Sequence, residues 1–374
     1  MKDVGVALIG TGFMGKAHAL AWRTVHAVFG NDPRPRLETL CDVPREKAET
    51  LAAQFGFARA TDDWREAITD ARVDVVSITT PNKMHAELVI EAARAGKHIW
   101  CEKPLAVSLD DARKMAAEVE KAGVVAVIGY NYVQNPAFLH AVELLRAGAI
   151  GRPIHFRGFV DEDYQADPQS PWSWRCLGDE AGLGVLGDMT CHLVSLARRL
   201  MGEIEVLAAD IQTVHASRPL ADGSGRAAVE NEDIASALLR FSSGARGVIS
   251  SSRVAWGRKN RLSFEVHGER GMLSFDQERM NELLLYQAEG APAEQGFKTI
   301  LSGPAHPPYG LFNPAPGHSM GFQDQKTIEA GAVIDAIAGR ESRAVLMNEA
   351  LAIEQTIHEI AAAGKGRDAD SSGA

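Results

Sequence analysis

The sequence has few cysteines and no long apolar segment. Only four of its 374 residues are cysteine, and none of them forms a C-x-x-C pair. Neither a disulfide framework nor a zinc site is therefore indicated, and buried thiols in a reducing compartment are expected. No apolar run approaches the ~20 residues of a membrane-spanning helix, and no signal peptide opens the chain. These absences predict a cytoplasmic protein with no metal site and no membrane partner.

Positive charge is also in deficit. The chain carries 39 Lys and Arg residues against 49 Asp and Glu residues, a formal net charge of −10. Nucleic acid and anionic lipid surfaces repel such a chain, so a neutral small molecule is the favoured partner. The length exceeds what one compact core usually holds, and the content of 45% hydrophobic and 24% charged residues is ordinary for globular proteins. Two domains are therefore expected.

Short apolar segments alternate with helical patterns in the first 130 residues. Strands are predicted at 4–9, 37–41, 73–79, 97–101 and 124–130, and helices at 14–29, 45–55, 85–95 and 109–121. This alternation is typical of βαβ units, whose right-handed crossovers build a doubly wound parallel sheet. Residues 1–130 are therefore predicted to be an α/β Rossmann domain.

The pattern changes after residue 131. One helix is predicted at 137–147, followed by strands at 154–160, 205–214, 234–241, 245–254, 261–267, 271–276 and 283–288. Strand runs joined by Gly-rich turns build antiparallel sheets. Residues 131–374 are therefore predicted to be an α+β domain with an open, mostly antiparallel sheet. One face of that sheet must be covered by helices or by another subunit, so a homo-oligomer is expected.

Two segments of the second half are predicted to be loops. Residues 218–226 are interpreted as an exposed excursion. Residues 302–321 form a long Gly- and Pro-rich loop whose aromatic and imidazole side chains favour a functional role. Residues 326–363 are predicted to be helical, with a frayed polar tail from Lys365.

A glycine-rich motif follows the first strand and opens a helix. It reads Gly10-Thr11-Gly12-Phe13-Met14-Gly15. Gly10 allows the tight turn, Gly12 lets the backbone approach a pyrophosphate, and Gly15 lets helix and strand pack closely. The helix N-terminus then offers N–H groups and partial positive charge to phosphates. The motif predicts a dinucleotide site.

The ends of the next strands carry further candidates. Asp42 would accept hydrogen bonds from ribose hydroxyls and repel a 2′-phosphate, which favours NAD over NADP, although Arg45 close behind it could grip such a phosphate. Thr80-Pro81-Asn82 ends another strand, where ligands of doubly wound sheets bind. For Asn82, a helix N-cap is an equal alternative to a cofactor contact.

Two more motifs complete a pattern. Residues 101–105 read Cys-Glu-Lys-Pro-Leu, and the Gly-rich segment 182–192 ends in D-x-x-x-H. Together with the glycine motif, with Thr80-Pro81-Asn82 before His85 and with Ala95-Gly96-Lys97-His98, they resemble the Gfo/Idh/MocA oxidoreductases over about residues 4 to 360. The resemblance implies an enzyme of carbohydrate metabolism, commonly a dimer or homotetramer.

The residues of these motifs can oxidise a secondary alcohol. Such a reaction needs a base for the hydroxyl proton, and imidazole suits it near neutral pH. Asp188 and His192 share one helix face at a spacing of four, and Lys103 could stabilise a developing alkoxide. On the residues alone, the favoured interpretation is that Asp188 is a helix N-cap and His192 a core histidine. The resemblance assigns Lys103, Asp188 and His192 as the catalytic set, with His192 as acid/base.

The resemblance also implies the surrounding contacts. The cofactor would be contacted by the glycine motif with Phe13 and Met14 and by Asp42, Thr80, Pro81, Asn82, His85, Glu102, Lys103, Trp174 and Arg175. The substrate would be contacted by Lys103, Asn131, Tyr132, Glu162, Tyr164, Arg175, Asp188, His192, His306 and His318. Alternatively, Trp174 and Arg175 form only a packed indole and a salt bridge. The arginine that the family often has near Val133 is absent, which weakens any transfer of function there.

The sequence therefore predicts an NAD-dependent dehydrogenase that oxidises a hydroxyl of a cyclic polyol or sugar of the inositol, L-glucose or levoglucosan type. Three alternatives stay open: an NADP-dependent sugar reductase, an enzyme that uses tightly bound NAD for transient oxidation, and a non-catalytic NAD-sensing protein. The substrate and the state of the Lys103–Pro104 peptide bond are left undecided by the sequence.

Overall fold

The computed structural model describes residues 3–371, with side chains to residue 365. The chain divides into two compact units. The first unit comprises the residues up to Gln134 together with Met320–Ala352. The second unit comprises Asn135–Ser319 and the residues from Ile353 onward. The sequence pattern had assigned 320–352 to the second domain, whereas the structure groups this segment with the first unit.

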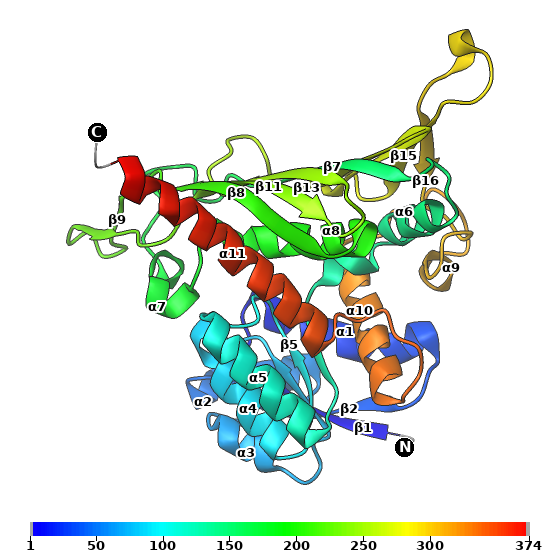
Figure 1. Ribbon diagram of the computed structural model, residues 1–374. Coiled ribbons are helices and arrows are strands. Elements are labelled where there is room, and N and C mark those ends of the chain that lie inside the picture. The colour runs from blue at the N-terminus through cyan, green and yellow to red at the C-terminus, as the bar shows by residue number, and fades with distance from the viewer. Residues whose placement is uncertain (1–2, 372–374) are drawn as a thin grey trace. The chain divides into compact units, whose positions relative to one another are not determined.

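The first unit is built on a six-stranded parallel sheet. Its strands are β1 (Asp3–Ile9), β2 (Arg34–Cys41), β3 (Arg59–Thr61), β4 (Val75–Ile78), β5 (His98–Cys101) and β6 (Ala126–Ile128). They lie in the order β3-β2-β1-β4-β5-β6 (Figure 1). The order reverses between β1 and β4, the switch point at which doubly wound sheets bind ligands. The predicted doubly wound sheet is confirmed.

Helices cover this sheet. They are α1 (Phe13–Phe29), α2 (Arg45–Phe55), α3 (Trp64–Thr69), α4 (His85–Arg94), α5 (Leu109–Ala122) and α10 (Phe322–Ile337). Helix α10 packs on α1, and the core between them and the sheet includes Trp22, Trp100 and Val333. A Cβ added to Gly331 would lie 3.2 Å from the Phe29 ring, so the glycine permits this close approach.

The predicted helix 326–363 is in fact two helices. Helix α10 ends at Ile337, and α11 (Met347–Ser371) begins after nine intervening residues. Gly339 between them has a φ of 70°, which ends α10 because other residues rarely adopt that conformation. The connection then runs beside the edge strand β6, where the Ile128 N–H donates to the Val345 carbonyl at 2.9 Å. The edge of the parallel sheet is thereby paired.

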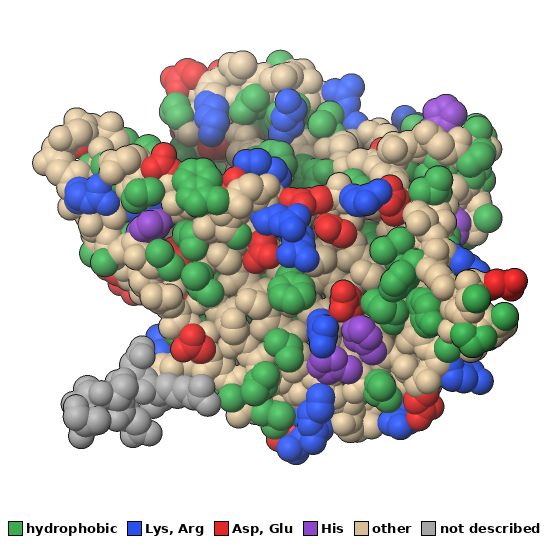
Figure 2. Space-filling view, turned by 90° about the horizontal axis from the view of Figure 1, so that it is seen from above, with side chains coloured by type: hydrophobic (Ala, Val, Ile, Leu, Met, Phe, Trp, Pro, Cys, Tyr) green, Lys and Arg blue, Asp and Glu red, His purple; other side chains and the backbone are tan. Residues whose placement is uncertain are grey.

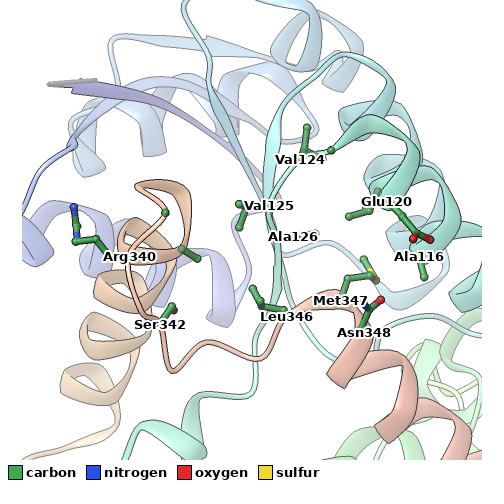
Figure 3. Close-up of a pocket in the computed structure, with 14 residues that line it drawn as sticks. Ala116, Glu120, Val124, Val125, Ala126, Arg340, Ser342, Leu346, Met347 and Asn348 are labelled. Atoms are coloured by element: carbon green, nitrogen blue, oxygen red, sulfur yellow. The ribbon is translucent and has the colours of Figure 1, made fainter.

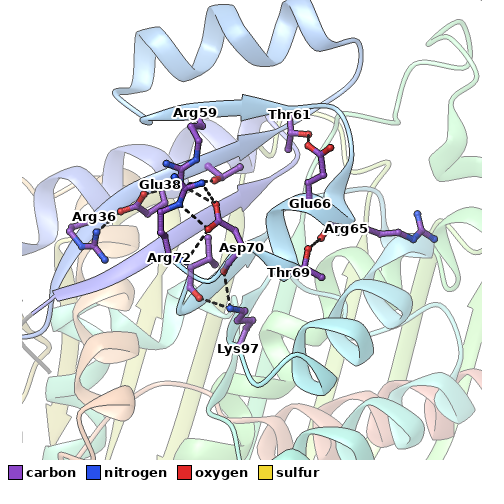
Figure 4. A network of polar contacts seen from close by, with 12 residues as sticks. Arg36, Glu38, Arg59, Thr61, Arg65, Glu66, Thr69, Asp70, Arg72 and Lys97 are labelled. Carbon is purple, nitrogen blue, oxygen red and sulfur yellow. Dashed lines mark hydrogen bonds and ion pairs between the residues drawn. The ribbon is translucent and has the colours of Figure 1, made fainter.

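The short elements β3 and α3 were not predicted, and polar contacts hold them in place. The Arg59 guanidinium binds Glu38 of β2 at 2.9 Å and Asp70 at 3.1 Å. Arg72 binds the same Asp70 carboxylate at 2.8 Å (Figure 4). The hydrogen bond from Arg72 holds the pKa of Asp70 far below its usual value. These contacts join the end of α3 to the sheet without any long apolar pattern.

The second unit contains an eight-stranded mixed sheet. Its strands are β7 (Pro153–Asp161), β8 (Ile204–Gln212), β11 (Ile234–Phe241), β12 (Arg246–Ser252), β13 (Arg261–Gly268), β14 (Gly271–Asp276), β15 (Glu282–Gln287) and β16 (Lys298–Leu301). They lie in the order β16-β15-β14-β13-β7-β12-β11-β8. Only β7 and β12 pair in parallel, so the predicted mostly antiparallel sheet is confirmed.

Helices line one face of this sheet, and the other is open. Side chains of β11 alternate between buried and more exposed positions. The buried face packs under α6 (Pro136–Arg146) and α8 (Cys191–Met201), where Leu193 of α8 lies against Gly158 of β7. The open face is solvent-exposed, as is common for antiparallel sheets that pack on the core with one face only.

The segment predicted as an exposed excursion at 218–226 is only partly exposed. Its ends form a hairpin of β9 (Ser217–Pro219) and β10 (Arg226–Ala228). The Arg218 side chain is fully buried, and its guanidinium donates to the carbonyls of Gln165 at 2.5 Å and Asp167 at 2.9 Å. The 302–321 segment likewise contains the short helix α9 (Tyr309–Phe312).

Two general expectations can be compared with this fold. All four cysteines are free and buried. Within the described part of the chain, no helix is both long and apolar enough to cross a bilayer.

A groove of about 520 Å³ in the first unit is lined by residues around Val124, Arg340 and Leu346 (Figure 3). The groove lies at the start of β6, at the amino ends of the parallel strands, whereas the predicted dinucleotide motif lies at their carboxyl ends.

Candidate active site

The glycine motif forms the turn from β1 into α1. Gly10 has a φ of 92°, and a Cβ there would lie 2.8 Å from the Thr79 carbonyl. A Cβ on Gly15 would lie 2.3 Å from the Gly10 carbonyl, so only glycine lets α1 pack this close to the turn. Gly12 is the N-cap of α1, and a Cβ on it would meet nothing within 4 Å. The helix N-terminus beside Gly12 is thus open to a ligand.

Asp42 follows the end of β2, close to this turn. It accepts hydrogen bonds from the Thr11 hydroxyl, from the Val43 N–H at 2.6 Å and from Lys47 Nζ at 2.9 Å. Burial alone would raise the pKa of Asp42, but these hydrogen bonds hold it below its usual value. Arg45 instead binds Glu49 at 3.2 Å, so the alternative of a phosphate-gripping Arg45 finds no support.

The loop after β4 contains a buried polar atom without a protein partner. Among the described residues, Thr80 Oγ1 is buried and makes no hydrogen bond. His85 behind it faces the Pro104 carbonyl at 2.9 Å and the Thr80 carbonyl at 3.2 Å. Burial lowers the pKa of His85, although the two carbonyls act in the opposite sense. Both nitrogens of His85 therefore face backbone carbonyls, and the neutral ring, with one N–H, donates a hydrogen bond to one of them at a time.

These residues fit a dinucleotide. The N-terminus of α1 is open at Gly12, Asp42 is held ionised, and Thr80 Oγ1 offers an unused hydrogen-bonding group. All three follow the carboxyl ends of β1, β2 and β4, which share one edge of a parallel sheet. Pro81 and the N-terminus of the 3₁₀ turn Asn82–Met84 come next along this edge.

The Glu102-Lys103-Pro104 motif follows β5 at the same edge. Glu102 is buried and accepts from His18 at 2.8 Å and from Lys326 at 2.5 Å. Lys103 is half-buried, and the Lys103–Pro104 peptide bond is cis. Asn131, after β6, is buried and donates to Gln325 of α10 at 3.3 Å. Tyr132 beside it is half-buried.

The second unit carries Asp188 in a π-helical turn, Leu186–Thr190, that runs directly into α8. Such turns are frequent at functional sites. The glycine-rich approach to it is explained by packing, because a Cβ on Gly184 would lie 2.1 Å from the Glu232 carbonyl. The Leu186 N–H also donates to Glu232 at 3.0 Å.

Asp188 accepts a hydrogen bond from the Tyr164 hydroxyl at 2.7 Å. Although Tyr164 is 38% exposed as a residue, desolvation of its hydroxyl and the charge of Asp188 raise its pKa well above the usual value, so the hydroxyl is protonated and donates. The structure gives α8 no side-chain cap, and the alternative of Asp188 as an N-cap finds no support. His192 lies in the first turn of α8 and is 7% exposed.

The remaining candidates of the second unit lie on other segments. Trp174 and Arg175 form a 3₁₀ turn in which the guanidinium lies 4.5 Å from the indole centroid. The N–H of Glu162 continues the pairing with Ser252 after β7. His306 packs against His140 of α6, with ring centroids 4.7 Å apart.

His318 is exposed, and its carbonyl accepts from the Tyr309 hydroxyl at 2.5 Å. The first unit also holds buried polar residues that sequence reasoning missed, namely His18, Ser77, Lys326 and Glu329. The signal that could have found them was the presence of ionisable residues in segments otherwise suited to a core.

A doubly wound unit with an open dinucleotide turn, joined to a unit that presents carboxylate and imidazole from one helix, defines a dinucleotide-dependent oxidoreductase. Two family models match the chain. One, described as an oxidoreductase family with an NAD-binding Rossmann fold, covers residues 4–130, and the other, the Gfo/Idh/MocA C-terminal domain, covers 138–274. The chain belongs to the Gfo/Idh/MocA family of oxidoreductases. The predictions of family, enzyme class and NAD as cofactor are confirmed.

Named relatives add detail. A levoglucosan dehydrogenase of Pseudarthrobacter phenanthrenivorans is 39% identical over 90% of each chain. A scyllo-inositol 2-dehydrogenase (NAD(+)) of Bacillus subtilis is 29% identical over 77% of this chain and 78% of the other. A solved levoglucosan dehydrogenase in complex with NADH and levoglucosan has a TM-score of 0.93 at 37% identity and covers 97% of this chain and 98% of its own.

Proposed function

We propose that the protein oxidises one secondary hydroxyl of a cyclic sugar or polyol to the ketone, with levoglucosan as the first substrate to test. The observation that carries the proposal is the Tyr164–Asp188 hydrogen bond, four residues before His192 in the sequence. The chain also has Lys103 just after β5, at the carboxyl ends of the parallel strands. The likeness to levoglucosan dehydrogenase over 90% of the chain supports this substrate class. Inositols and L-glucose are the next candidates.

Each proposed catalytic group has one task. His192 takes the proton of the substrate hydroxyl, for which a neutral imidazole is suited near pH 7. Lys103 donates a hydrogen bond to the same oxygen and stabilises its developing negative charge. Asp188, held by Tyr164, orients the substrate and the imidazole. When bound, NAD supplies the acceptor for the hydride that leaves the carbon.

The residues after β1, β2 and β4 would hold the cofactor. Backbone N–H groups at Gly12, Phe13 and Met14 would bind the pyrophosphate, and Asp42 would bind the adenosine ribose. Glu162, Trp174 and Arg175 are proposed to line the substrate side, together with Asn131 and Tyr132. We also propose a homo-oligomer, dimer or tetramer, formed through the open face of the second unit's sheet.

The proposal is tested with a panel of levoglucosan, inositol isomers, L-glucose and D-glucose, each with NAD or NADP, followed by NADH absorbance. We expect turnover with NAD and at least one ring substrate. His192→Ala should lower kcat by about 100-fold or more, because general-base catalysis contributes that much. Its Kd for NADH should stay within about threefold of the wild type, a difference below 1 kcal/mol.

His26→Ala is the matched control, since His26 lies in the last turn of α1 and faces a backbone carbonyl. Full turnover by the His192→Ala variant would overturn the assigned role. No turnover of any ring substrate would overturn the activity itself. Stoichiometric NAD in the purified protein would instead favour transient oxidation, and a preference for NADP would favour a reductase.

A further inference from the structure

A connected group of buried polar side chains lies behind Glu102 in the first unit. We call it the Lys326 cluster, and it consists of His18, Trp22, Ser77, Glu102, Lys326 and Glu329. Each of these residues is at most 4% exposed. They come from α1, β4, the end of β5 and α10, so the cluster joins four elements of the unit. Burying so many polar groups is costly unless all are paired.

Lys326 is the centre of the cluster. Its ammonium lies 2.5 Å from Glu102 Oε1 and 2.7 Å from Glu329 Oε2, and 5.4 Å from the centroid of the Trp100 ring. Burial alone would lower the pKa of Lys326, but the two carboxylates raise it above its usual value. The fully buried side chain is therefore a cation, and Glu102 is the anion that pairs with it at the sheet edge.

The rest of the cluster fixes the other side of Glu102. Burial lowers the pKa of His18 to about 4, so its ring is neutral near pH 7 and has one N–H. That N–H belongs on Nε2, because Nε2 faces the Glu102 carboxylate at 2.8 Å. Nδ1 then accepts from the Ser77 hydroxyl at 2.7 Å, and Ser77 accepts from Trp22 Nε1 at 3.3 Å. Every donor in this series of hydrogen bonds, from Trp22 to Glu102, has an acceptor.

Glu102 is also held through its backbone and by the space around it. Its N–H donates to the Ile78 carbonyl at 2.9 Å, which continues the pairing of β5 with β4. A Cβ on Gly129 would lie 2.5 Å from Glu102 Oε1, so the glycine provides the room for the carboxylate. The residue after Lys103 is held as well, because the Pro104 carbonyl faces the buried His85 ring at 2.9 Å. Lys103 thus sits between two anchored neighbours.

We propose that Lys326 is a positioning residue for the reaction: by binding Glu102 from inside the first unit, it fixes the backbone from which Lys103 reaches the substrate oxygen. The inference rests on the proposed function, in which Lys103 contacts that oxygen. Lys326 is fully buried and acts only through Glu102, so it is not itself a catalytic residue. Through Lys326, the residues that position Lys103 include part of α10, a segment that the sequence pattern assigns to the other domain.

Two variants test the inference by different routes. Lys326→Met removes the buried cation, whereas Gly129→Ala displaces the Glu102 carboxylate and deletes no charge. In both we expect kcat to fall at least about tenfold, because misplacing a catalytic group by ~1 Å can cost about 100-fold. The Kd for NADH, measured by fluorescence, should change by less than about threefold. Rates are normalised to NADH-binding sites, so that misfolded protein is not counted.

A second readout does not depend on turnover. The rate at which acetic anhydride modifies Lys103 is followed by mass spectrometry of its peptide, with Lys114 in the same sample as reference. We expect both variants to change the Lys103 rate relative to Lys114 by more than about threefold, since the reactivity of an amine follows its local environment. Lys121→Met and Gly296→Ala are the matched controls: Lys121 is exposed on α5, and a Cβ on Gly296 would meet nothing within 4 Å.

The outcomes separate the inference from the proposed function. Wild-type kcat and wild-type Lys103 labelling in the folded variants would overturn the inference, even if both melt at lower temperature. If Lys326→Met does not fold, the Gly129→Ala variant alone decides in the same way. If the wild type oxidises no sugar, the proposed function fails, whereas altered Lys103 labelling would still show that Lys326 positions this lysine.

Discussion

Two carboxylates on either side of Lys326 differ in their state of ionisation. Burial would raise the pKa of Glu102, but the charge of Lys326 and the hydrogen bond from His18 bring it far below its usual value. Burial raises the pKa of Glu329 to about 7, and the same lysine only partly opposes it. Near neutral pH, Lys326 thus pairs with one full anion and with a second group that is partly protonated. A single residue of α10 thereby makes stability depend on pH.

Glu329→Gln tests this dependence. Between its ordinary pKa of about 4.5 and the folded value of about 7, the unfolded chain has lost a proton that the folded chain keeps. The wild type therefore loses stability as pH rises from about 4.5 to about 7, and the glutamine variant does not. We expect the variant's advantage in free energy of unfolding to grow by about 2 kcal/mol between pH 5 and pH 8.

Thermal unfolding at the two pH values provides the measurement, with a shift of a few °C per kcal/mol. Glu87→Gln is the control, since Glu87 is an exposed residue of α4 that pairs with Arg65 at the surface. His18 titrates alike in both proteins and cancels in the difference. An advantage that stays constant with pH would show that Glu329 ionises at its ordinary value in the folded chain.

At the scale of elements, two glycines in the turn from β1 into α1 are expected to have different roles, one in the stability of the fold and one in cofactor binding. The Cβ that Gly15 lacks would lie 2.3 Å from a backbone carbonyl, whereas the one that Gly12 lacks would meet only open space. Both glycines belong to one motif, yet the first serves the packing of α1 and the second serves the approach of a ligand. Substitution by alanine should therefore have different effects at the two positions.

Gly15→Ala should lower the thermal midpoint, because overpacking against backbone typically costs about 1–3 kcal/mol. Gly12→Ala should leave the midpoint of the cofactor-free protein within about 1 °C, a change of less than about 1 kcal/mol. Its Kd for NADH should rise by about tenfold or more, since the methyl group occupies the path of the pyrophosphate. Differential scanning fluorimetry and NADH titration measure the two effects. NADH binding by Gly12→Ala at wild-type affinity would contradict this division of roles.

The elements also show how far the sequence could be read. A continuous apolar run located β1, which is buried on both faces, and apolar periodicity located α2 and β11, which each bury one face. It missed the three-residue β3 and six-residue α3, which are held by Arg59 and Asp70 rather than by an apolar face. It also misplaced α10, whose buried Gln325, Lys326 and Glu329 interrupt the apolar pattern. Gln325 and Lys326 are paired with partners more than 190 positions away, a relation that local patterns do not contain.

For the candidate site, the motifs were the readable part. Gly10, Lys103 and Asp188 stand in short patterns whose chemistry is local, so the sequence could single them out. Tyr164 was named as a substrate contact, but its hydrogen bond to Asp188 was not predicted, because that bond depends on how the segment after β7 meets the π-helical turn. The cofactor contact of His85 stays a prediction, and in the structure both nitrogens of this ring face backbone carbonyls.

At the scale of the whole molecule, the open face of the second unit's sheet is the surface on which we expect another protein subunit to bind. Leu238 of β11 is 51% exposed on it, and Leu207 of β8 is 41% exposed. Basic, acidic and imidazole side chains lie among the apolar ones, as in the pair Arg157 and Glu265 at 3.9 Å (Figure 2). Such a mixed face suits a second copy of the same chain, because a twofold interface pairs each patch with itself.

We therefore expect the wild type to sediment as a dimer or tetramer at about 10 μM, as specific interfaces of about 800 Å² per partner often allow. Leu238→Glu would force a carboxylate into the interface core without its pair, and it should shift the protein toward smaller species. Leu311→Glu is the matched control, because Leu311 is 55% exposed but lies on α9, away from this sheet face. Analytical ultracentrifugation gives the masses. A monomeric wild type would refute the oligomer, whereas an oligomer that is insensitive to Leu238→Glu would place the interface elsewhere.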